Sequence, residues 1–306
     1  MAKCVVVGGN GFLGSHVVDA LAAAGHEVTA FDRFSGDVSF ASADTRIVVG
    51  DFLNQADVRG ALAGQQYVFH FLSTTTPASS ENDPMLDVRT NIAASIELFE
   101  VACAAGVERV VFASTGGAIY GDHPEPALDE SVLPQPVSPY AIGKLAIEGY
   151  LRYFRRKFGL SSVSLRISNP YGPRQRANKR QGVVPIFLHH ALTGTPLTVF
   201  GDGSMVRDFL YVEDAATMIA ATATPESRFD TYNLGSGEGH SISEVIDVIR
   251  AVTGLPLELE YQPAPTTFVE RVVLDTSRFT DEFDIRSAVS LEEGVRRTWD
   301  DMRAPV

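Results

Sequence analysis

Three glycines near the start of the chain constrain its fold more than any other feature. A short apolar run, Val5–Val7, leads into Gly8, Gly11 and Gly14, and a helical apolar pattern occupies Phe12–Ala24. A short apolar run bounded by glycine is typical of a buried parallel strand. Glycines at this spacing allow a tight turn, a close backbone approach to a pyrophosphate and close packing of helix on strand. The pattern predicts a dinucleotide site whose phosphates meet the helix N-terminus at Gly8, Gly11, Phe12 and Leu13.

Strand-like and helix-like segments alternate along the first half, which predicts repeated βα units and a parallel sheet covered on both faces. The second half is richer in proline and glycine and suggests a smaller α/β lobe. We therefore expect an α/β protein with a Rossmann-type doubly wound sheet in residues 1–168, to which about 207–230 return, and a substrate lobe of 169–206 and 231–306. The expected helices are 54–62, 86–105, 139–158, 182–193, 212–223, 241–252 and 290–302, and the later expected strands are 28–31, 47–49, 67–71, 109–113, 163–167, 197–200 and 257–261.

Acidic residues follow the second and third expected strands. Asp32 ends the second strand, and a carboxylate there accepts both ribose hydroxyls of an adenosine and repels a 2′-phosphate. This favours NAD over its phosphorylated form, although Arg33 could attract a phosphate and Asp32 could instead cap a turn. Asp51 and Phe52 close the third strand, where the adenine edge would lie.

Tyr140 and Lys144 mark a candidate catalytic helix. Ser138 is a good N-cap, Pro139 suits the first helical position, and residues four apart share one helix face. An ammonium group and an oxidised nicotinamide both favour the phenolate, so Tyr140 can act as a base near neutral pH despite an ordinary pKa of roughly 10. The YxxxK spacing is commonplace alone and becomes specific only beside the glycine fingerprint.

Two hydroxyl side chains, Ser114 and Thr115, follow the strand at 109–113. Ligands bind at the carboxyl ends of strands in open α/β sheets, so either hydroxyl can hold the substrate oxygen that exchanges a proton. We favour Thr115 as the catalytic hydroxyl and place Ser114 second. Ordinary turn chemistry is the alternative role for both residues.

The composition excludes several classes of protein. A formal net charge of −13 repels nucleic acid. The two cysteines, Cys4 and Cys103, have no metal-binding spacing and are expected to be reduced core thiols. No apolar stretch reaches the length of a membrane span, so we expect a cytoplasmic protein.

At this point the chain resembles the extended short-chain dehydrogenase/reductases, and within them the NAD-dependent epimerase/dehydratase family. The matching segments run nearly from end to end and keep the family's order. They are the glycine fingerprint at 8–14, Gly50-Asp51, the segment 113–121, Tyr140 with Lys144, the segment 166–173, 201–203 with 207–209, 233–235 and 291–294.

The resemblance implies a nucleotide-sugar 4-epimerase of the UDP-glucose/UDP-galactose type with tightly bound NAD. Tyr140 would take the 4-hydroxyl proton while C4 gives a hydride to NAD, and the 4-keto sugar would turn and take the hydride back on its other face. The remaining implied positions are Lys144 as partner of Tyr140, Thr115 at the 4-hydroxyl, Asn91, Phe71, Leu72 and Ser73 along the cofactor, Ser73 also at the hexose, Asn169 and Arg207 at the diphosphate, and Phe200 at the nucleotide base.

The chain also departs from the family's pattern. Gly116 and Gly117 replace the Asp-Glu pair that follows the threonine in the related dehydratases, so dehydration is disfavoured. Pro265 stands where the epimerases usually carry a diphosphate-binding arginine, for which Arg271 or the basic run 174–180 could substitute. Val272 is small at the position that gates sugar size, and an N-acetylated sugar is a further candidate.

Two other functions share these motifs. A reductase acting on a 4-keto-6-deoxy nucleotide sugar would need an exchangeable, usually phosphorylated cofactor, against which Asp32 argues. A non-catalytic NAD-binding protein would be free to lose Tyr140, Lys144 or Thr115. The resemblance further implies a homodimer formed through the helices near 90–105 and 140–157.

Overall fold

The computed structural model describes residues 1–175, 182–265 and 267–304. These residues form two compact units, which are described separately. The first unit comprises Met1–Thr115, Pro136–Arg166 and Ala216–Tyr232, and the second comprises Gly116–Gln135, Ile167–Ala215 and Asn233–Val306. The division into a cofactor domain and a substrate lobe expected from the sequence is a functional one, and it remains a prediction.

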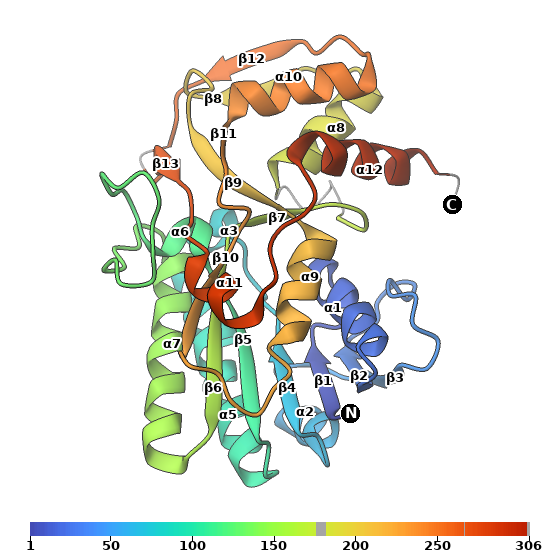
Figure 1. The fold of residues 1–306 in the computed structure, drawn as a ribbon, viewed down its shortest axis with the longest axis vertical. Coiled ribbons are helices and arrows are strands. Elements are labelled where there is room, and N and C mark those ends of the chain that lie inside the picture. Colours follow the sequence, from blue (N-terminus) through green and yellow to red (C-terminus); the bar gives the residue numbers. More distant parts are fainter. Residues whose placement is uncertain (176–181, 266, 305–306) are drawn as a thin grey trace. The chain divides into compact units, whose positions relative to one another are not determined.

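Within the described residues, seven strands form one sheet in the order β10-β6-β5-β4-β1-β2-β3 (Figure 1). The pairs β3–β2, β2–β1, β1–β4 and β4–β5 are parallel, as the βα alternation predicted. The predicted doubly wound α/β fold is confirmed. The strands are β1 (Lys3–Val7), β2 (Glu27–Asp32), β3 (Arg46–Val49), β4 (Tyr67–His70), β5 (Arg109–Thr115), β6 (Ser161–Ile167) and β10 (Thr231–Leu234).

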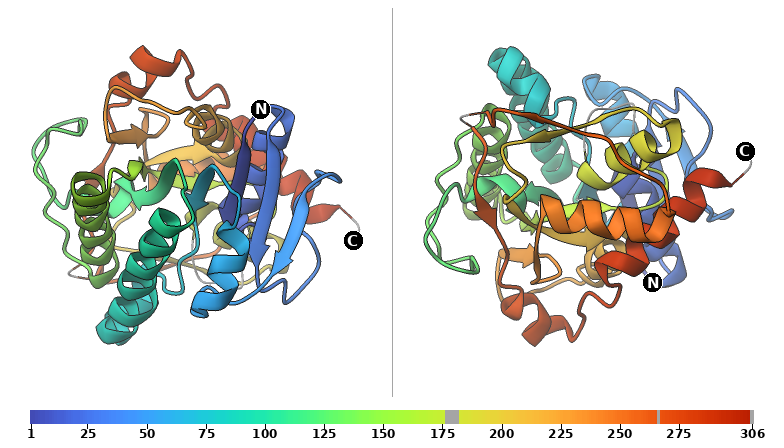
Figure 2. Two further views of the ribbon diagram at one scale, coloured as in Figure 1. Left: turned by 90° about the horizontal axis from the view of Figure 1, so that it is seen from below. Right: turned by 90° about the horizontal axis from the view of Figure 1, so that it is seen from above.

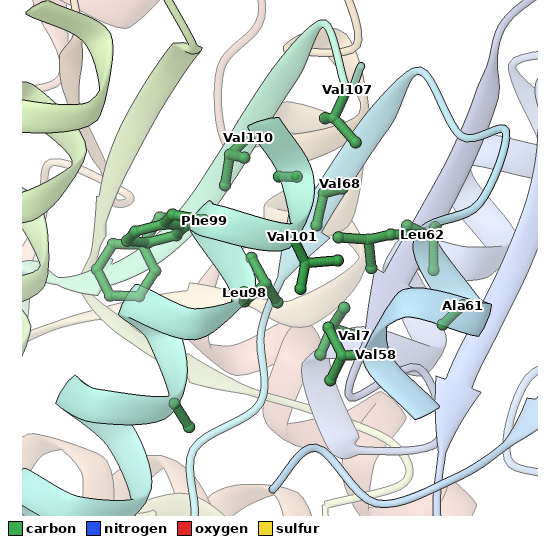
Figure 3. Packing of buried hydrophobic residues seen from close by; sticks show 14 of the residues in the cluster. Val7, Val58, Ala61, Leu62, Val68, Leu98, Phe99, Val101, Val107 and Val110 are labelled. Carbon is green, nitrogen blue, oxygen red and sulfur yellow. The ribbon is translucent and has the colours of Figure 1, made fainter. Parts of the chain in front are cut away.

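A hydrophobic cluster packs three helices onto one face of this sheet. The helices are α2 (Gln55–Leu62), α5 (Ala94–Ala104) and α7 (Pro139–Phe158), which lie side by side in the left view of Figure 2. Alternate residues of the strands point to the same face, so Val5 and Val7 enter this cluster together. Figure 3 shows Val7 and Val68 of the strands close to Val58, Leu62 and Leu98 of the helices.

Helix α1 (Phe12–Ala23) packs against β1 and β2. The buried residues Cys4 and Val6 alternate with Val5 and Val7, and therefore point to the opposite face of the sheet. Helices consequently cover both faces. The glycine turn and the carboxyl end of β5 lie at the same edge of the sheet because the strands are parallel.

The second unit is built around strand β9 (Val206–Tyr211). This strand pairs with β11 (Gly239–Ser241) in antiparallel fashion and with β7 (Asn169–Tyr171) and β13 (Arg271–Val272) in parallel. Strand β8 (Leu197–Phe200) pairs in parallel with β12 (Leu259–Gln262). The sequence did not predict β9, because charged residues interrupt its apolar run.

Three helices of the second unit share a second hydrophobic cluster, and they lie next to one another in the right view of Figure 2. These are α8 (Val183–Thr193), α10 (Ile242–Thr253) and α12 (Leu291–Arg303). In α10, a capping box of Ser241 and Glu244 starts the helix, and Gly254 ends it with φ 66°.

The helix expected at 86–105 is continuous but changes its winding. It consists of α4 (Pro84–Asp87), the π-helical segment η1 (Val88–Ala93) and α5. The other helices are α3 (Pro77–Asn82), α6 (Gly116–Ile119), α9 (Val212–Ala221) and α11 (Ser277–Phe283). None of the described helices has both the length and the apolar character needed to cross a membrane.

Candidate active site

Gly8 and Gly14 of the glycine turn have no room for a side chain. Gly8 has φ 88°, and its N–H and that of Gly9 both donate to the carbonyl of Phe31, at 2.9 and 3.2 Å. A Cβ on Gly14 would lie 2.0 Å from the Gly8 oxygen, and a Cβ on Gly8 would lie 2.9 Å from the Leu72 nitrogen. The glycines thus let β1, α1 and the segment after β4 meet at one point.

The N-terminus of α1 begins at this turn and has no side-chain cap. Gly11 is the N-cap and supplies no side-chain hydrogen bond to the first turn, which begins with Phe12 and Leu13. Backbone N–H groups at a helix start carry partial positive charge and bind anions. The residues present therefore fit a pyrophosphate, and their assignment to the cofactor's phosphates remains a prediction.

Asp32 lies at the end of β2, and its carboxylate accepts hydrogen bonds from the N–H groups of Asn10 (3.1 Å) and Arg33 (2.7 Å). These contacts hold the carboxylate beside the glycine turn, and they also satisfy the alternative role of a turn cap. Asp51 accepts from the Leu53 N–H at 2.9 Å. Phe52 is buried in the hydrophobic cluster of the sheet, so only its backbone is available to a ligand.

The residues after β4 divide between the core and solvent. Phe71 is half-buried and stacks on Phe69 with ring centroids 6.4 Å apart, while Ser73 is exposed and donates to the Thr75 carbonyl at 2.9 Å. Asn91 of η1 is buried, and its Oδ1 accepts from the Thr74 N–H at 2.9 Å. Asn91 therefore fixes this loop.

The carboxyl end of β5 is joined to α7 by two buried hydrogen bonds. Lys144 donates from Nζ to the Ala113 carbonyl at 2.8 Å, and Ser114 donates to Glu148 Oε1 at 2.6 Å. Arg166 of β6 also binds Glu148, with Nε at 3.1 Å and Nη2 at 2.9 Å from its carboxylate oxygens. The Ser114 hydroxyl is thus used inside the protein, which leaves Thr115 as the better placed of the two predicted hydroxyls.

Tyr140 and Lys144 lie on one face of α7. The Ser138 hydroxyl accepts from the Ala141 N–H at 3.3 Å, and Pro139 occupies the first turn, as the sequence predicted. The Lys144 Nζ lies 5.6 Å from the centroid of the half-buried Tyr140 ring and 4.8 Å from that of Phe112.

The electrostatics differ from the expectation that Lys144 makes Tyr140 a base. Burial, aided by the charge of Asp87, raises the pKa of Tyr140 to about 12. Burial also lowers the pKa of Lys144 to about 8, against the opposing charges of Asp87 and Glu148. Because burial and Asp87 both favour the neutral phenol, the chain by itself keeps the phenol protonated. The oxidised cofactor would supply the positive charge that favours the phenolate.

The other predicted substrate residues belong to the second unit. Arg207 of β9 donates to the carbonyls of Val206, Glu270 and Val269, at 2.8, 3.4 and 2.6 Å. Arg271 is exposed on the adjacent strand and donates from Nε to the Pro126 carbonyl at 3.2 Å. Of the basic run proposed as a substitute, Arg174 is described, while Arg176, Lys179 and Arg180 lie outside the described residues.

Asn169 and Phe200 also lie in this unit. Asn169 donates from Nδ2 to the Asp208 carbonyl at 2.9 Å, and a Cβ on Gly117 would lie 3.2 Å from its Oδ1. Phe200, at the end of β8, is exposed and packs edge-on against Phe268 with centroids 5.6 Å apart. No carboxylate follows Thr115 in α6, where Gly116 and Gly117 stand.

Two buried carboxylates beside the candidate site were not found from the sequence. Glu148 shares the spacing of Tyr140 and Lys144, since each is four residues from the next, and that periodicity could have identified it. Asp87 stands four residues before Asn91 and is buried with it. Its approach to α7 depends on Gly143, and no sequence pattern reveals such a contact.

Comparison with known proteins gives a consistent result. The sequence model of the NAD dependent epimerase/dehydratase family matches residues 4–235. The chain is 33% identical over 303 residues to a UDP-glucose 4-epimerase of Mycolicibacterium smegmatis, with 97% of each chain covered. It superposes on the Thermotoga maritima UDP-glucose 4-epimerase with UDP-glucose (TM-score 0.92, 34% identity, 98% of each chain). It also superposes on the Thermus thermophilus UDP-glucose 4-epimerase complex with NAD (TM-score 0.91, 36% identity, 99% of each chain).

Proposed function

Because the chain belongs to the NAD dependent epimerase/dehydratase family, we propose that it is a nucleotide-sugar 4-epimerase of the UDP-glucose/UDP-galactose type. One observation carries the proposal: Tyr140 and Lys144 share one face of α7, and Lys144 is bonded to the carboxyl end of β5, where Thr115 lies. That edge of the sheet also holds the glycine turn. The names and bound ligands of the related proteins support the same activity.

Each residue of the candidate site can be given a role in cofactor binding or in proton transfer. NAD, when bound, supplies hydride acceptance and return at the sugar carbon. Gly8, Gly11 and the first turn of α1 would hold its pyrophosphate, and Asp32 its ribose. Tyr140 takes the proton of the 4-hydroxyl and later gives it back, while Lys144 stabilises the phenolate.

Thr115 is the proposed hydrogen-bond partner of the 4-hydroxyl. Ser114 has a structural role, since its hydroxyl donates to Glu148 and joins the end of β5 to α7. The side chains proposed for the nucleotide and diphosphate are Phe200, Asn169, Arg207, Arg271 and, at the hexose, Ser73. In the absence of a carboxylate after Thr115, water elimination has no acid and base, so epimerisation is favoured over dehydration.

The chain is further proposed to act in the cytoplasm as a homodimer that uses the region of α5 and α7. Exposed aromatic residues on α7, Tyr150 and Tyr153, support an interface there. Sedimentation equilibrium of the purified protein tests the dimer.

The substrate is tested with a panel of UDP-, dTDP- and GDP-sugars, including UDP-N-acetylglucosamine, followed through the H4 and anomeric NMR signals. We expect interconversion of UDP-glucose and UDP-galactose, and Val272 favours turnover of the acetylated sugar as well. Tyr140→Phe should lower kcat by about 10²–10⁴-fold, whereas Tyr153→Phe on the same helix should not.

The proposed reaction also predicts that NAD stays with the purified protein in stoichiometric amount, because it is regenerated in every cycle. Denatured protein should release oxidised NAD. Release of none, together with consumption of added reduced cofactor by a 4-keto-6-deoxy sugar, would identify a reductase instead.

A further inference from the structure

A buried carboxylate lies against the catalytic helix. Asp87, the last residue of α4, is 3% exposed. Its Oδ1 accepts hydrogen bonds from the Thr75 hydroxyl and from Asn91 Nδ2, the latter at 2.7 Å. Since Asn91 also binds Thr74, Asp87 belongs to the network that fixes the loop after β4.

The second oxygen of Asp87 meets the backbone of α7. A Cβ built on Gly143 would lie 2.2 Å from Asp87 Oδ2. Gly143 stands inside a 20-residue helix, where glycine costs about 1 kcal/mol relative to alanine. It is not among the glycines with positive φ, so backbone conformation does not require it. What glycine provides here is room for the carboxylate against the backbone of α7.

Asp87 differs from the other acid near Lys144. Glu148 is bound by the guanidinium of Arg166, so much of its charge is already balanced. The hydrogen-bond donors seen for Asp87 among the described residues, Thr75 and Asn91, are neutral. A buried charge acts strongly on the charged groups around it because the local dielectric is low.

We propose that Asp87 is a positioning residue for the epimerase reaction: it keeps the Lys144 ammonium charged and fixes α7 against the loop at Thr74 and Thr75. The inference rests on the proposed function. Without the Asp87 carboxylate, burial would favour the neutral amine of Lys144, which cannot stabilise a phenolate. The same charge opposes ionisation of Tyr140, so Asp87 sets both ends of the pH range in which the pair works.

Other charged groups face this region from the elements packed on α7. His70 at the end of β4 stays neutral, because burial and the charge of Lys144 lower its pKa to about 3. The remaining groups are far more exposed or turned to the opposite end of the sheet: Glu81 of α3, Arg89 of η1, Glu97 and Glu100 of α5, and Arg109 at the start of β5.

The test is Asp87→Asn, which keeps an acceptor for Thr75 and Asn91 but removes the charge. Loss of a negative charge lowers the pKa of both the ammonium and the phenol. Both limbs of the kcat–pH profile should therefore move to lower pH, by roughly one unit. A lower kcat with unmoved limbs would mean that Asp87 only packs, and it would overturn the proposal.

Asp83→Asn is the matched control. Asp83 lies in the same segment, is exposed and caps α4 through the Leu86 N–H at 3.0 Å, a role that an amide oxygen can keep. The same charge change at this screened position should leave the profile in place.

A second measurement separates this inference from the proposed function. The ζ-carbon NMR signal of labelled tyrosine, assigned with Tyr140→Phe, reports the phenol titration in the NAD-containing protein without turnover. Its midpoint should fall in Asp87→Asn. If it falls while no nucleotide sugar is epimerised, the electrostatic effect of Asp87 on the phenol stands and the proposed function fails. If the midpoint is unchanged in an active enzyme, the proposed function stands and the inference fails.

Gly143→Ala tests the contact itself. The added Cβ must displace the carboxylate or the helix, so kcat should fall at least about tenfold while the protein stays folded. Gly149→Ala on the same helix is its control, since the nearest atom to the new Cβ is the tip of Arg152 at 3.8 Å. Equal activity of the two variants would contradict a role for the Asp87 contact.

Discussion

Tyr140 and Lys144 share one desolvated face, and burial acts on both in the direction opposite to catalysis. It favours the neutral phenol and the neutral amine, whereas proton transfer needs the phenolate beside the ammonium. The Ala113 carbonyl and the carboxylates of Asp87 and Glu148 keep the ammonium in place. The pair therefore becomes a competent base only with the positive charge of the oxidised cofactor.

The lowered pKa of Lys144 predicts a loss of kcat at alkaline pH. Its pKa in the folded chain is about 8, below the ordinary value of 10.5, so the ammonium is lost as the pH rises through that lower value. We expect kcat to decline above a pH of about 8. Lys144→Arg should reduce kcat but remove this decline, because guanidinium stays protonated. Lys157→Arg, at the end of the same helix, should keep the wild-type profile; a decline retained in Lys144→Arg would assign it to another group.

Substitutions of the two hydroxyl residues at the end of β5 should have different effects, one on stability and the other on activity. Ser114→Ala leaves the buried Glu148 with one donor fewer, and it should lower the free energy of unfolding by about 1–3 kcal/mol. Thr115→Val keeps the shape of the side chain, so it should lower kcat about a hundredfold with little change in unfolding. Denaturant titrations and steady-state kinetics on both variants check this, and the opposite pattern would make Ser114 the catalytic hydroxyl.

At the scale of elements, the local signals in the sequence were sufficient for the glycine turn and the catalytic helix. Ser138, Pro139 and Gly159 mark the ends of α7 by capping chemistry, which acts within a few residues. The meeting of Asp87 with Gly143 joins residues more than fifty positions apart. Such contacts arise from packing and leave no periodic trace, so the sequence missed them.

The close packing of the glycine turn predicts that a side chain at Gly14 displaces helix α1 and weakens NAD binding. Gly14→Ala would place a Cβ 2.0 Å from the Gly8 oxygen, so α1 must move from β1 and the protein should lose retained NAD. Gly60→Ala is the matched control, because nothing lies within 4 Å of its new Cβ. Within α2 that change should raise stability by about 0.5–1 kcal/mol. Retention of NAD in Gly14→Ala, measured after denaturation, would contradict the assigned turn.

At the scale of the whole molecule, a parallel sheet covered by helices on both faces was predictable from the βα alternation, while the sugar and its contacts were not. Arg207 shows why: its guanidinium binds backbone carbonyls of 206, 269 and 270, and those partners follow from the pairing of β9 with β13. The position of Arg207, which is proposed to bind the diphosphate, thus depends on strand pairs that are distant in sequence.

Cofactor removal is the corresponding prediction for the whole chain. A ligand that binds the folded protein stabilises it by about 2.7 kcal/mol at a hundredfold excess over its Kd. Stripping NAD should therefore lower the melting temperature by roughly 5 °C or more, and added NAD should restore it. Differential scanning calorimetry checks this; no change on stripping would count against tight NAD binding.

The central claim is that Tyr140 handles the 4-hydroxyl proton while the hydrogen on C4 leaves and returns to the same carbon. UDP-glucose carrying deuterium at C4 tests it directly when incubated with the enzyme in ordinary water. The account predicts UDP-galactose that keeps the deuterium at C4, and no such product from Tyr140→Phe. Deuterium lost to solvent, or equal turnover by the variant, would contradict it.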